Sequence, residues 1–158
     1  MNGVVSQLPA DAGAETRNQF AAFCWRMHRG HVEVLLITSR DTGRWIIPKG
    51  WPIEGLGPAG SAEREAWEEA GVRGTIHPDA IGYYCYDKLT KGVALPCMVA
   101  VFPLRVARLA DKFPERKQRR RKWFVAEKAA RKVAEPELRV MLARIGADPS
   151  LLPTVRAD

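Results

Sequence analysis

The sequence has few cysteines and no long hydrophobic run. Its 158 residues include Cys24, Cys85 and Cys97, which are far apart and form no Cys-x-x-Cys pair. An odd number at such spacing indicates neither a disulfide framework nor a zinc knuckle, and we expect all three to be buried as small apolar residues. The longest mostly apolar run, 93–104, contains two prolines. It is well short of the roughly 20 residues that a membrane span needs.

The amino-terminal segment lacks the features of a secretory leader. Residues 1–16 contain Asp11 and Glu15. They have neither a basic start nor the apolar stretch of roughly 7 to 15 residues that a signal peptide uses. We therefore expect a cytoplasmic protein without a membrane partner. No internal repeat or low-complexity block is present, and we expect one domain at 17–146 between flexible tails at 1–16 and 147–158.

Positive charge is concentrated in one segment. The net charge is +7, and residues 116–122 (RKQRRRK) contain six basic residues and no acid, so this segment accounts for six of those seven charges. A clustered cationic segment points to a polyanionic partner, such as nucleic acid, phospholipid or a densely phosphorylated small molecule. A solvated charged turn is the alternative interpretation.

The order of the predicted elements indicates a layered α/β fold. Strands are expected at 19–26, 32–38, 44–47, 72–77, 81–88, 96–106 and 122–125. Three prolines and four glycines in 48–60 predict an irregular loop. A helix follows, with Pro58 in its first turn, a run of good helix formers at 61–70 and Gly71 at its carboxyl end. Two more helices are expected at 126–134 and 137–145, which predicts an α/β sandwich with a mixed sheet.

Three carboxylates share the first predicted helix. Glu65 and Glu69 are four residues apart and lie one above the other, and Glu68 adjoins Glu65 on the same side. Because like charges at these spacings repel, the arrangement needs a compensating cation, and Mg²⁺ suits oxygen ligands of this kind. A Glu-rich helix that is only a wet surface is the alternative.

Together with the preceding loop, this segment resembles the Nudix box, G-x5-E-x7-R-E-U-x-E-E-x-G-U, where U is a bulky apolar residue. Eight of nine specified positions match when Ala66 is accepted as apolar: Gly50, Arg64, Glu65, Ala66, Glu68, Glu69, Gly71 and Val72. Leu56 occupies the position of the first glutamate, and Glu54 is two residues earlier. The resemblance to the Nudix hydrolase family implies a Nudix-type α/β/α sandwich with a mixed β-sheet.

The resemblance also implies roles for the box residues. Glu65 and Glu69 match the glutamates that coordinate Mg²⁺ or Mn²⁺, and the backbone carbonyl of Lys49 is a further expected ligand. Glu68 matches a position that serves as ligand or as proton acceptor in different family members. Arg64 should pair with Glu68 and hold its side chain. Gly50 and Gly71 are the structural glycines of the box.

The general base has two candidates. In the hydrolysis that the resemblance implies, a carboxylate accepts the proton of the attacking water. Our first choice is Glu68, which belongs to the box. Glu115, in the loop before the basic segment, is the second.

Residues outside the box resemble the diphosphoinositol polyphosphate and dinucleoside polyphosphate hydrolases. The likeness lies in Ser39-Arg40, in 44–48 (RWIIP) and in 119–124 (RRRKWF), and it extends over roughly residues 17–145. It implies hydrolysis of a pyrophosphate linkage in a small, highly phosphorylated substrate. The charge of such a substrate requires basic residues beyond the metal site. The candidates for substrate binding are Arg17, Ser39, Arg40, Lys88, Lys91, Arg119, Arg121 and Lys122.

Some alternatives stay open. If 119–124 is extended, Arg119 and Arg121 share one face while Arg120 and Lys122 share the other, so at most half of the segment contacts substrate. A mononucleotide or ADP-sugar substrate is one alternative, and a non-catalytic RNA-binding Nudix domain is another. Three intact carboxylates favour the hydrolase, and nucleic acid is not the expected partner. The oligomeric state is left open, with a monomer as one option.

The tryptophans are expected in different places. Trp25, Trp45 and Trp123 fall in predicted strands and should belong to the core. Trp51 falls in the irregular loop, where its ring is expected at the rim of a pocket.

Overall fold

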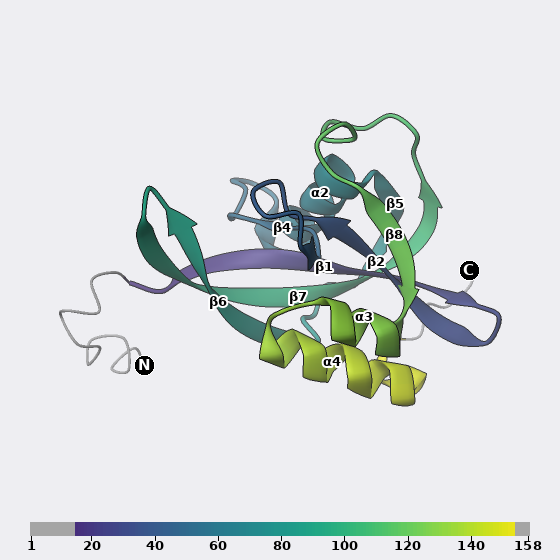
Figure 1. Cartoon of the computed structure of the whole chain (residues 1–158). Coiled ribbons are helices and arrows are strands. Elements are labelled where there is room, and N and C mark those ends of the chain that lie inside the picture. Colours follow the sequence, from purple (N-terminus) through teal and green to yellow (C-terminus); the bar gives the residue numbers. More distant parts are fainter. Residues whose placement is uncertain (1–14, 154–158) are drawn as a thin grey trace.

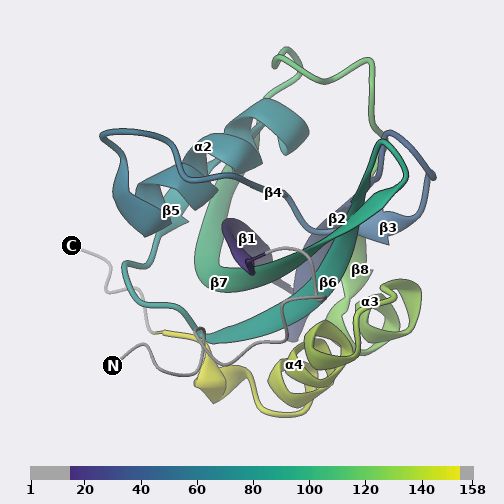
Figure 2. The same cartoon turned by 90° about the vertical axis from the view of Figure 1, so that its left-hand side faces the viewer.

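A curved eight-stranded sheet forms the centre of the fold, with α2 on one side and α3 and α4 on the other (Figures 1 and 2). The computed structural model describes residues 15–153. The strands are β1 (Arg17–His28), β2 (His31–Thr38), β3 (Trp45–Ile46), β4 (Lys49–Gly50), β5 (Val72–Ile76), β6 (Gly82–Thr90), β7 (Val93–Leu109) and β8 (Arg121–Val125). The helices are α2 (Gly57–Ala70), α3 (Ala126–Lys132), α4 (Pro136–Ala147) and the short 3-10 helix η2 (Pro149–Leu151).

The sheet is mixed, as predicted. Strands run in the order β3-β2-β1-β7-β5, while β4 pairs with β1, β6 with β7 and β8 with β2. β1 and β7 are parallel, and the other pairs are antiparallel. The α/β class and the three-layer sandwich are therefore confirmed.

Two tight hairpins shape the ends of the sheet. Arg29 and Gly30, between β1 and β2, have φ angles of 52° and 79°, and Lys91 and Gly92, between β6 and β7, have 51° and 78°. Two consecutive residues with positive φ form the turn whose twist matches that of the flanking strands. The predicted turn at Gly30 is confirmed, and Lys91 lies at the tip of the second hairpin.

Alternation along the strands divides the core into two layers. In β2, Leu35 packs in the cluster beneath α2, while its neighbour Leu36 packs in the cluster beneath α3 and α4. Successive strand residues point to opposite faces, so one run of apolar residues serves both layers. The contribution of α2 to its cluster is three alanines, Ala62, Ala66 and Ala70. These small side chains let α2 lie close to the sheet.

The carboxyl end of α2 lies where the sequence predicted it, whereas its amino end includes residues that were expected in a loop. Gly71 has φ of 68° and its N–H donates to the carbonyls of Ala66 and Trp67, as expected for a left-handed glycine cap. The predicted position of Pro58 in the first turn is confirmed, because the helix begins at Gly57. Residues 57–60, which we expected in the irregular loop, are therefore helical. The carboxyl-terminal half of α2 contains the box glutamates.

Two other expectations need correction. Cys85 is exposed, whereas Cys24 and Cys97 are buried as predicted. The strand alternation explains this, because Cys85 follows buried Tyr84 and faces the opposite side. The carboxyl-terminal tail was predicted to begin at 147, but 149–151 form η2 and Leu152 is buried in the core.

The remaining parts of the predicted tails, 1–14 and 154–158, lie outside the described residues. Within residues 15–153, no helix has both the length and the apolar character required to cross a membrane.

The tryptophans predicted in strands belong to the core. Trp25 is buried, and Trp45 and Trp123 are partly buried against the two clusters.

Candidate active site

A polar pocket of about 350 Å³ lies at one end of the sheet, between α2, β4, β6 and the loop before β8. Many of the residues predicted from the sequence line it: Ser39, Arg40, Lys49, Gly50, Glu65, Glu69, Lys88 and Arg119. Glu115 and Trp51 line it too, so the expected position of Trp51 is confirmed. These residues are up to 80 positions apart in the sequence, and the fold brings them to one cavity.

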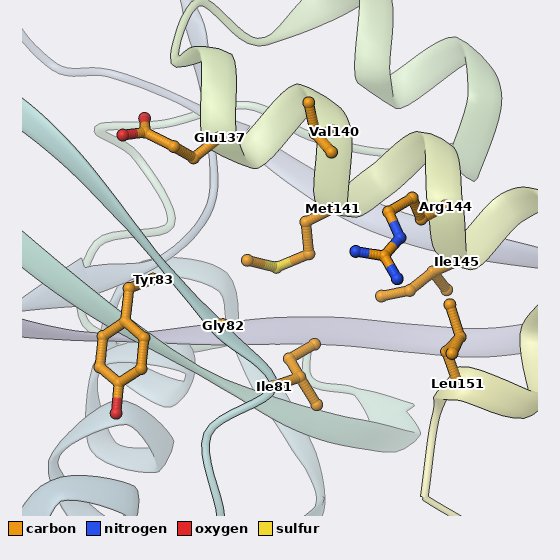
Figure 3. Close-up of a pocket in the computed structure, with 9 residues that line it drawn as sticks. All are labelled: Ile81, Gly82, Tyr83, Glu137, Val140, Met141, Arg144, Ile145 and Leu151. Atoms are coloured by element: carbon orange, nitrogen blue, oxygen red, sulfur yellow. The ribbon is translucent and has the colours of Figure 1, made fainter.

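Figure 3 shows a second pocket, of about 370 Å³, between α4, β6 and η2. Apolar side chains such as Ile81, Met141 and Ile145 line it together with Glu137 and Arg144. None of the predicted site residues, all of which are in the described part of the chain, lines this second pocket. The polar pocket, which contains the predicted site residues, is therefore the candidate active site.

Glu65 and Glu69 meet in the polar pocket. Their carboxyl groups share a hydrogen bond, and Glu69 also accepts the backbone N–H of Lys49 at 3.3 Å. Gly50 allows this arrangement, because a Cβ there would lie 2.4 Å from the carboxyl carbon of Glu65. The absence of a side chain at Gly50 thus lets β4 approach the carboxyl of Glu65.

Burial governs the protonation of this pair. It raises the pKa of Glu69 to about 8, with Glu65 adding to the shift while Arg119 and Lys49 oppose it. Burial also raises the pKa of Glu65. A buried and a half-buried carboxyl in contact resist ionising together, and a divalent cation would relieve that cost. Since hard divalent ions prefer oxygen donors, the pair fits such an ion.

Glu68 lies outside the pocket. Its side chain is 38% exposed, and Oε2 is 4.0 Å from Nη1 of Arg64, which is the expected i,i+4 pair. On a helix, Glu68 is about 100° away from Glu69 around the axis, so only one of them can point into the cavity. Within residues 15–153, no group of three His, Cys, Asp or Glu side chains converges closely enough to hold a metal ion.

The departure from the box motif is also outside the pocket. Leu56 is the residue that precedes the first turn of α2 and is exposed. Neither Leu56 nor Glu54 lines the polar pocket. The first box carboxylate therefore has no substitute from the adjacent residues.

Glu115 reaches the pocket because the loop before β8 docks on the end of α2. Its N–H donates to the carbonyl of Glu68 at 2.9 Å. Its carboxylate accepts a hydrogen bond from Nε of Arg119 at 2.9 Å and lies 3.8 Å from Nη1 of Arg40. The second-choice base is thus a pocket residue, and the first choice is not.

Arg119 is the one residue of the basic segment that lines the polar pocket. Its side chain is only 8% exposed. Nη1 donates to the carbonyl of Thr38 at 3.1 Å, and Nη2 is 3.6 Å from Oε2 of Glu69. The guanidinium therefore contacts the carboxylates of the site.

The other predicted phosphate contacts fall into two groups. Ser39, Arg40 and Lys88 line the pocket, whereas Arg17, Lys91, Arg121 and Lys122 do not. Arg121 donates to the carbonyl of Ala70 at 2.8 Å and lies over the ring of Phe113. Arg119 is in the loop before β8, which begins at Arg121. The expected alternation nevertheless holds, because Arg119 and Arg121 line another pocket together. Arg120 and Lys122 lie over the rings of Trp45 and Phe124, which pack against each other.

Sequence reasoning missed three polar residues of the pocket, Gln19, Asp41 and Tyr86. The hydroxyl of Tyr86 donates to Oε1 of buried Gln19 at 2.6 Å, and the ammonium of Lys49 lies 5.0 Å from the centre of the Tyr86 ring. Burial lowers the pKa of Lys49, and nearby Glu69 opposes that shift. Gln19 and Tyr86 are polar positions within apolar strands, which is the signal that could have identified them.

An ion pair between a partly exposed arginine and a buried glutamate was also missed. Nη1 of Arg44 is 2.9 Å from Oε2 of Glu135, whose side chain is buried at the start of α4. The pair joins the segment before β3 to α4. No local pattern predicts it, because the partners are 91 residues apart.

Comparisons with known proteins agree with this geometry. The NUDIX domain family matches residues 17–145, and the chain therefore belongs to the Nudix family. Mouse diphosphoinositol polyphosphate phosphohydrolase 3-alpha is 31% identical over 115 residues, which cover 72% of this chain and 66% of that protein. Nudix hydrolase 12, mitochondrial, from Arabidopsis thaliana is 30% identical over 102 residues, which cover 62% and 50%. The chain thus spans about half to two thirds of the length of these relatives.

Solved structures share the fold. The C. elegans Ap4A hydrolase aligns with a TM-score of 0.60 at 22% identity, covering 84% of this chain and 97% of that one. The NUDIX domain of Shewanella oneidensis NrtR, complexed with ADP ribose, aligns with a TM-score of 0.62 at 13% identity, covering 95% and 97%. At these identities the alignments show the fold alone.

Proposed function

We propose that this chain hydrolyses a pyrophosphate linkage in a small, highly phosphorylated molecule. In this proposal Glu65, Glu69 and the backbone carbonyl of Lys49 hold Mg²⁺ or Mn²⁺. The observation that carries it is the contact between half-buried Glu65 and buried Glu69 in a pocket that also contains basic side chains. A cytoplasmic location, expected from the sequence, stays a prediction.

The residues of the pocket divide the chemistry between them. A divalent cation held by the glutamate pair would polarise the phosphoanhydride and make the attacking water more acidic. The water oxygen forms a bond to phosphorus, the bond to the bridging oxygen breaks, and the leaving phosphate takes the electron pair. A carboxylate accepts the water proton, while Arg40 and Lys88 neutralise negative charge on the substrate.

A polyphosphate is the substrate class that the site favours. Arg40 and Lys88 line the pocket in addition to the metal-binding pair, and a substrate with few phosphates would not require both. Among the relatives, the mouse protein is named for diphosphoinositol polyphosphate and the C. elegans structure for Ap4A. We therefore propose a diphosphoinositol polyphosphate or a dinucleoside polyphosphate.

Trp51 supports a second candidate, the hydrolysis of a mononucleotide or an ADP-sugar. Its ring is 39% exposed at the pocket and offers a stacking surface for a base. The NrtR domain, whose structure contains ADP ribose, has the same fold. A dinucleoside polyphosphate would use both the ring and the basic residues.

A substrate panel tests the proposal. We would measure phosphate and nucleotide release from an inositol pyrophosphate, a dinucleoside hexaphosphate, ADP-ribose and a nucleoside triphosphate, with Mg²⁺, with Mn²⁺ and with EDTA. The expected result is EDTA-sensitive turnover with kcat/KM at least about 10-fold higher for one of the two polyphosphates. A preference for ADP-ribose selects the second candidate. No turnover, together with RNA binding that weakens steeply with salt, selects a binding domain.

Lys88 and Lys91 provide a matched pair for the substrate contacts. Lys88→Ala should raise KM for the polyphosphate about 10-fold, which corresponds to losing one hydrogen bond to a charged group. Lys91→Ala should change KM less than about 2-fold, because Lys91 is at the hairpin tip and does not line the pocket. Steady-state kinetics on both variants measures this. Equal effects would show that the hairpin tip also contacts the substrate.

Glu115 is favoured over Glu68 as the general base by its place in the pocket. Glu115→Gln should lower kcat by about 100-fold or more, within the range for loss of a positioned base. Glu68→Gln should lower it only a few-fold. Single-turnover rates of the two variants at saturating Mg²⁺ distinguish the candidates. The reverse order of effects would return the assignment to Glu68.

A further inference from the structure

Every nitrogen of the Arg119 guanidinium faces an oxygen of the protein. Nε donates to Glu115 at 2.9 Å and Nη1 donates to the carbonyl of Thr38 at 3.1 Å. Nη2 is 3.6 Å from Glu69, which makes this the longest of the three contacts. Because the side chain is almost entirely buried, few donors are free for a substrate phosphate. Arg119 therefore has a role that the charge of its segment did not predict.

The pocket contains equal numbers of carboxylates and basic side chains. The carboxylates are Asp41, Glu65, Glu69 and Glu115, and the basic side chains are Arg40, Lys49, Lys88 and Arg119. Arg40 is exposed, and its Nη1 is 3.8 Å from Glu115. Arg119 is the buried cation that faces both Glu69 and Glu115.

A divalent cation would enter a cluster that already has its own counter-ions. It would bring two positive charges close to a buried guanidinium, and like charges repel strongly where water is excluded. The weakest contact of Arg119, that to Glu69, is the one that such an ion would break. The contacts to Glu115 and Thr38 can hold the side chain in place when this happens.

We infer that Arg119 is the internal counter-ion of the glutamate pair and that a divalent cation must displace its guanidinium from Glu69 in order to bind. This inference rests on the metal site of the proposed function and goes beyond it, since it assigns Arg119 to the control of metal affinity. The substrate-free protein then binds metal weakly, and the negative charge of a polyphosphate compensates the added cation. Metal and substrate binding are coupled through this residue.

Titration of the substrate-free protein with Mn²⁺, with free Mn²⁺ followed by electron paramagnetic resonance, tests the inference. Arg119→Gln should bind Mn²⁺ at least about 10-fold more tightly than the unmodified chain, because a cation next to the ion is removed. Arg120→Gln is the matched control. It removes the same charge one residue along the chain, from an exposed side chain that lies over the ring of Trp45. The control should change Mn²⁺ affinity less than about 2-fold.

Thermal unfolding provides a readout that does not depend on turnover. Without metal, Arg119→Gln should unfold at a lower temperature than the unmodified chain, since the glutamates lose their counter-ion. Mn²⁺ should then raise its Tm by more than it raises that of the unmodified chain. If Arg119→Gln does not fold, Glu115→Gln and the double variant Arg119→Gln/Glu115→Gln replace it, because the double variant keeps the charge balance. The double variant should bind Mn²⁺ more tightly than Glu115→Gln.

The outcomes separate this inference from the proposed function. Equal or weaker Mn²⁺ binding by Arg119→Gln, with binding still abolished by Glu69→Gln, overturns the counter-ion role and leaves the metal site standing. Mn²⁺ binding that does not depend on Glu69, or that is absent from every variant, overturns the metal site and the counter-ion role together.

Discussion

Replacing Glu69 by glutamine is expected to lower turnover at least about 100-fold at saturating Mg²⁺. The substitution keeps the size of the side chain and removes its charge, so the proposed metal loses a ligand that it needs in the transition state. The effect should be large because Glu69 is buried, so water has little access to replace the lost carboxylate. Steady-state rates on the preferred substrate, measured across a Mg²⁺ titration, provide the test.

Glu63→Gln is the matched control for this experiment. Glu63 is on the same helix, and the substitution makes the same change of charge, but its side chain is exposed and does not line the pocket. Its rate should stay within about 2-fold of the unmodified chain. More than a tenth of the original rate in Glu69→Gln would show that this carboxylate is not a metal ligand.

Adding a single methyl group at Gly50 is expected to lower kcat/KM by about 100-fold. The new Cβ would lie 2.4 Å from the carboxyl carbon of Glu65 and 2.6 and 2.8 Å from its two oxygens. The carboxyl would have to move by about 1 Å, and a displacement of that size at a catalytic group can cost about 100-fold. Stability should change by less than about 1 kcal/mol, because the group that moves is the end of a flexible side chain.

Two measurements on Gly50→Ala distinguish displacement from unfolding. Urea denaturation should give nearly the original free energy of unfolding, while the kinetic assay shows the loss of activity. Gly60→Ala is the control, since its added methyl meets only Cβ of Leu56, at 3.2 Å. Full activity in Gly50→Ala would mean that Glu65 does not need its position against β4.

The spacing of the box was sufficient to identify Glu65 and Glu69 as a pair. Four residues are close to one turn of a helix, so these side chains are adjacent wherever the helix lies. Glu68 could not be assigned in the same way. Whether a residue about 100° around the helix faces a cavity depends on the loop that docks beside it, and that loop brings Glu115 instead.

The basic segment illustrates a second limit of local patterns. Its charge indicated a polyanionic partner, yet the residues of the segment have separate roles in the fold. Arg119 contacts the glutamates, Arg121 caps the carbonyl end of α2, and Lys122 lies over the ring of Phe124. The charges alone do not predict these separate roles. The roles differ because Arg119 is in a loop, while Arg121 and Lys122 are in β8.

The sequence by itself determined the family, the α/β class and the glutamate pair, because each follows from spacing and propensities within a short stretch of chain. Only the tertiary structure decided which basic residues share the pocket with that pair. Thr38 in β2, Glu69 in α2, and Glu115 and Arg119 in the loop before β8 come from three separate segments and meet through sheet register and loop docking. Contacts between such distant segments depend on the packing of the whole domain, so no local sequence pattern predicts them.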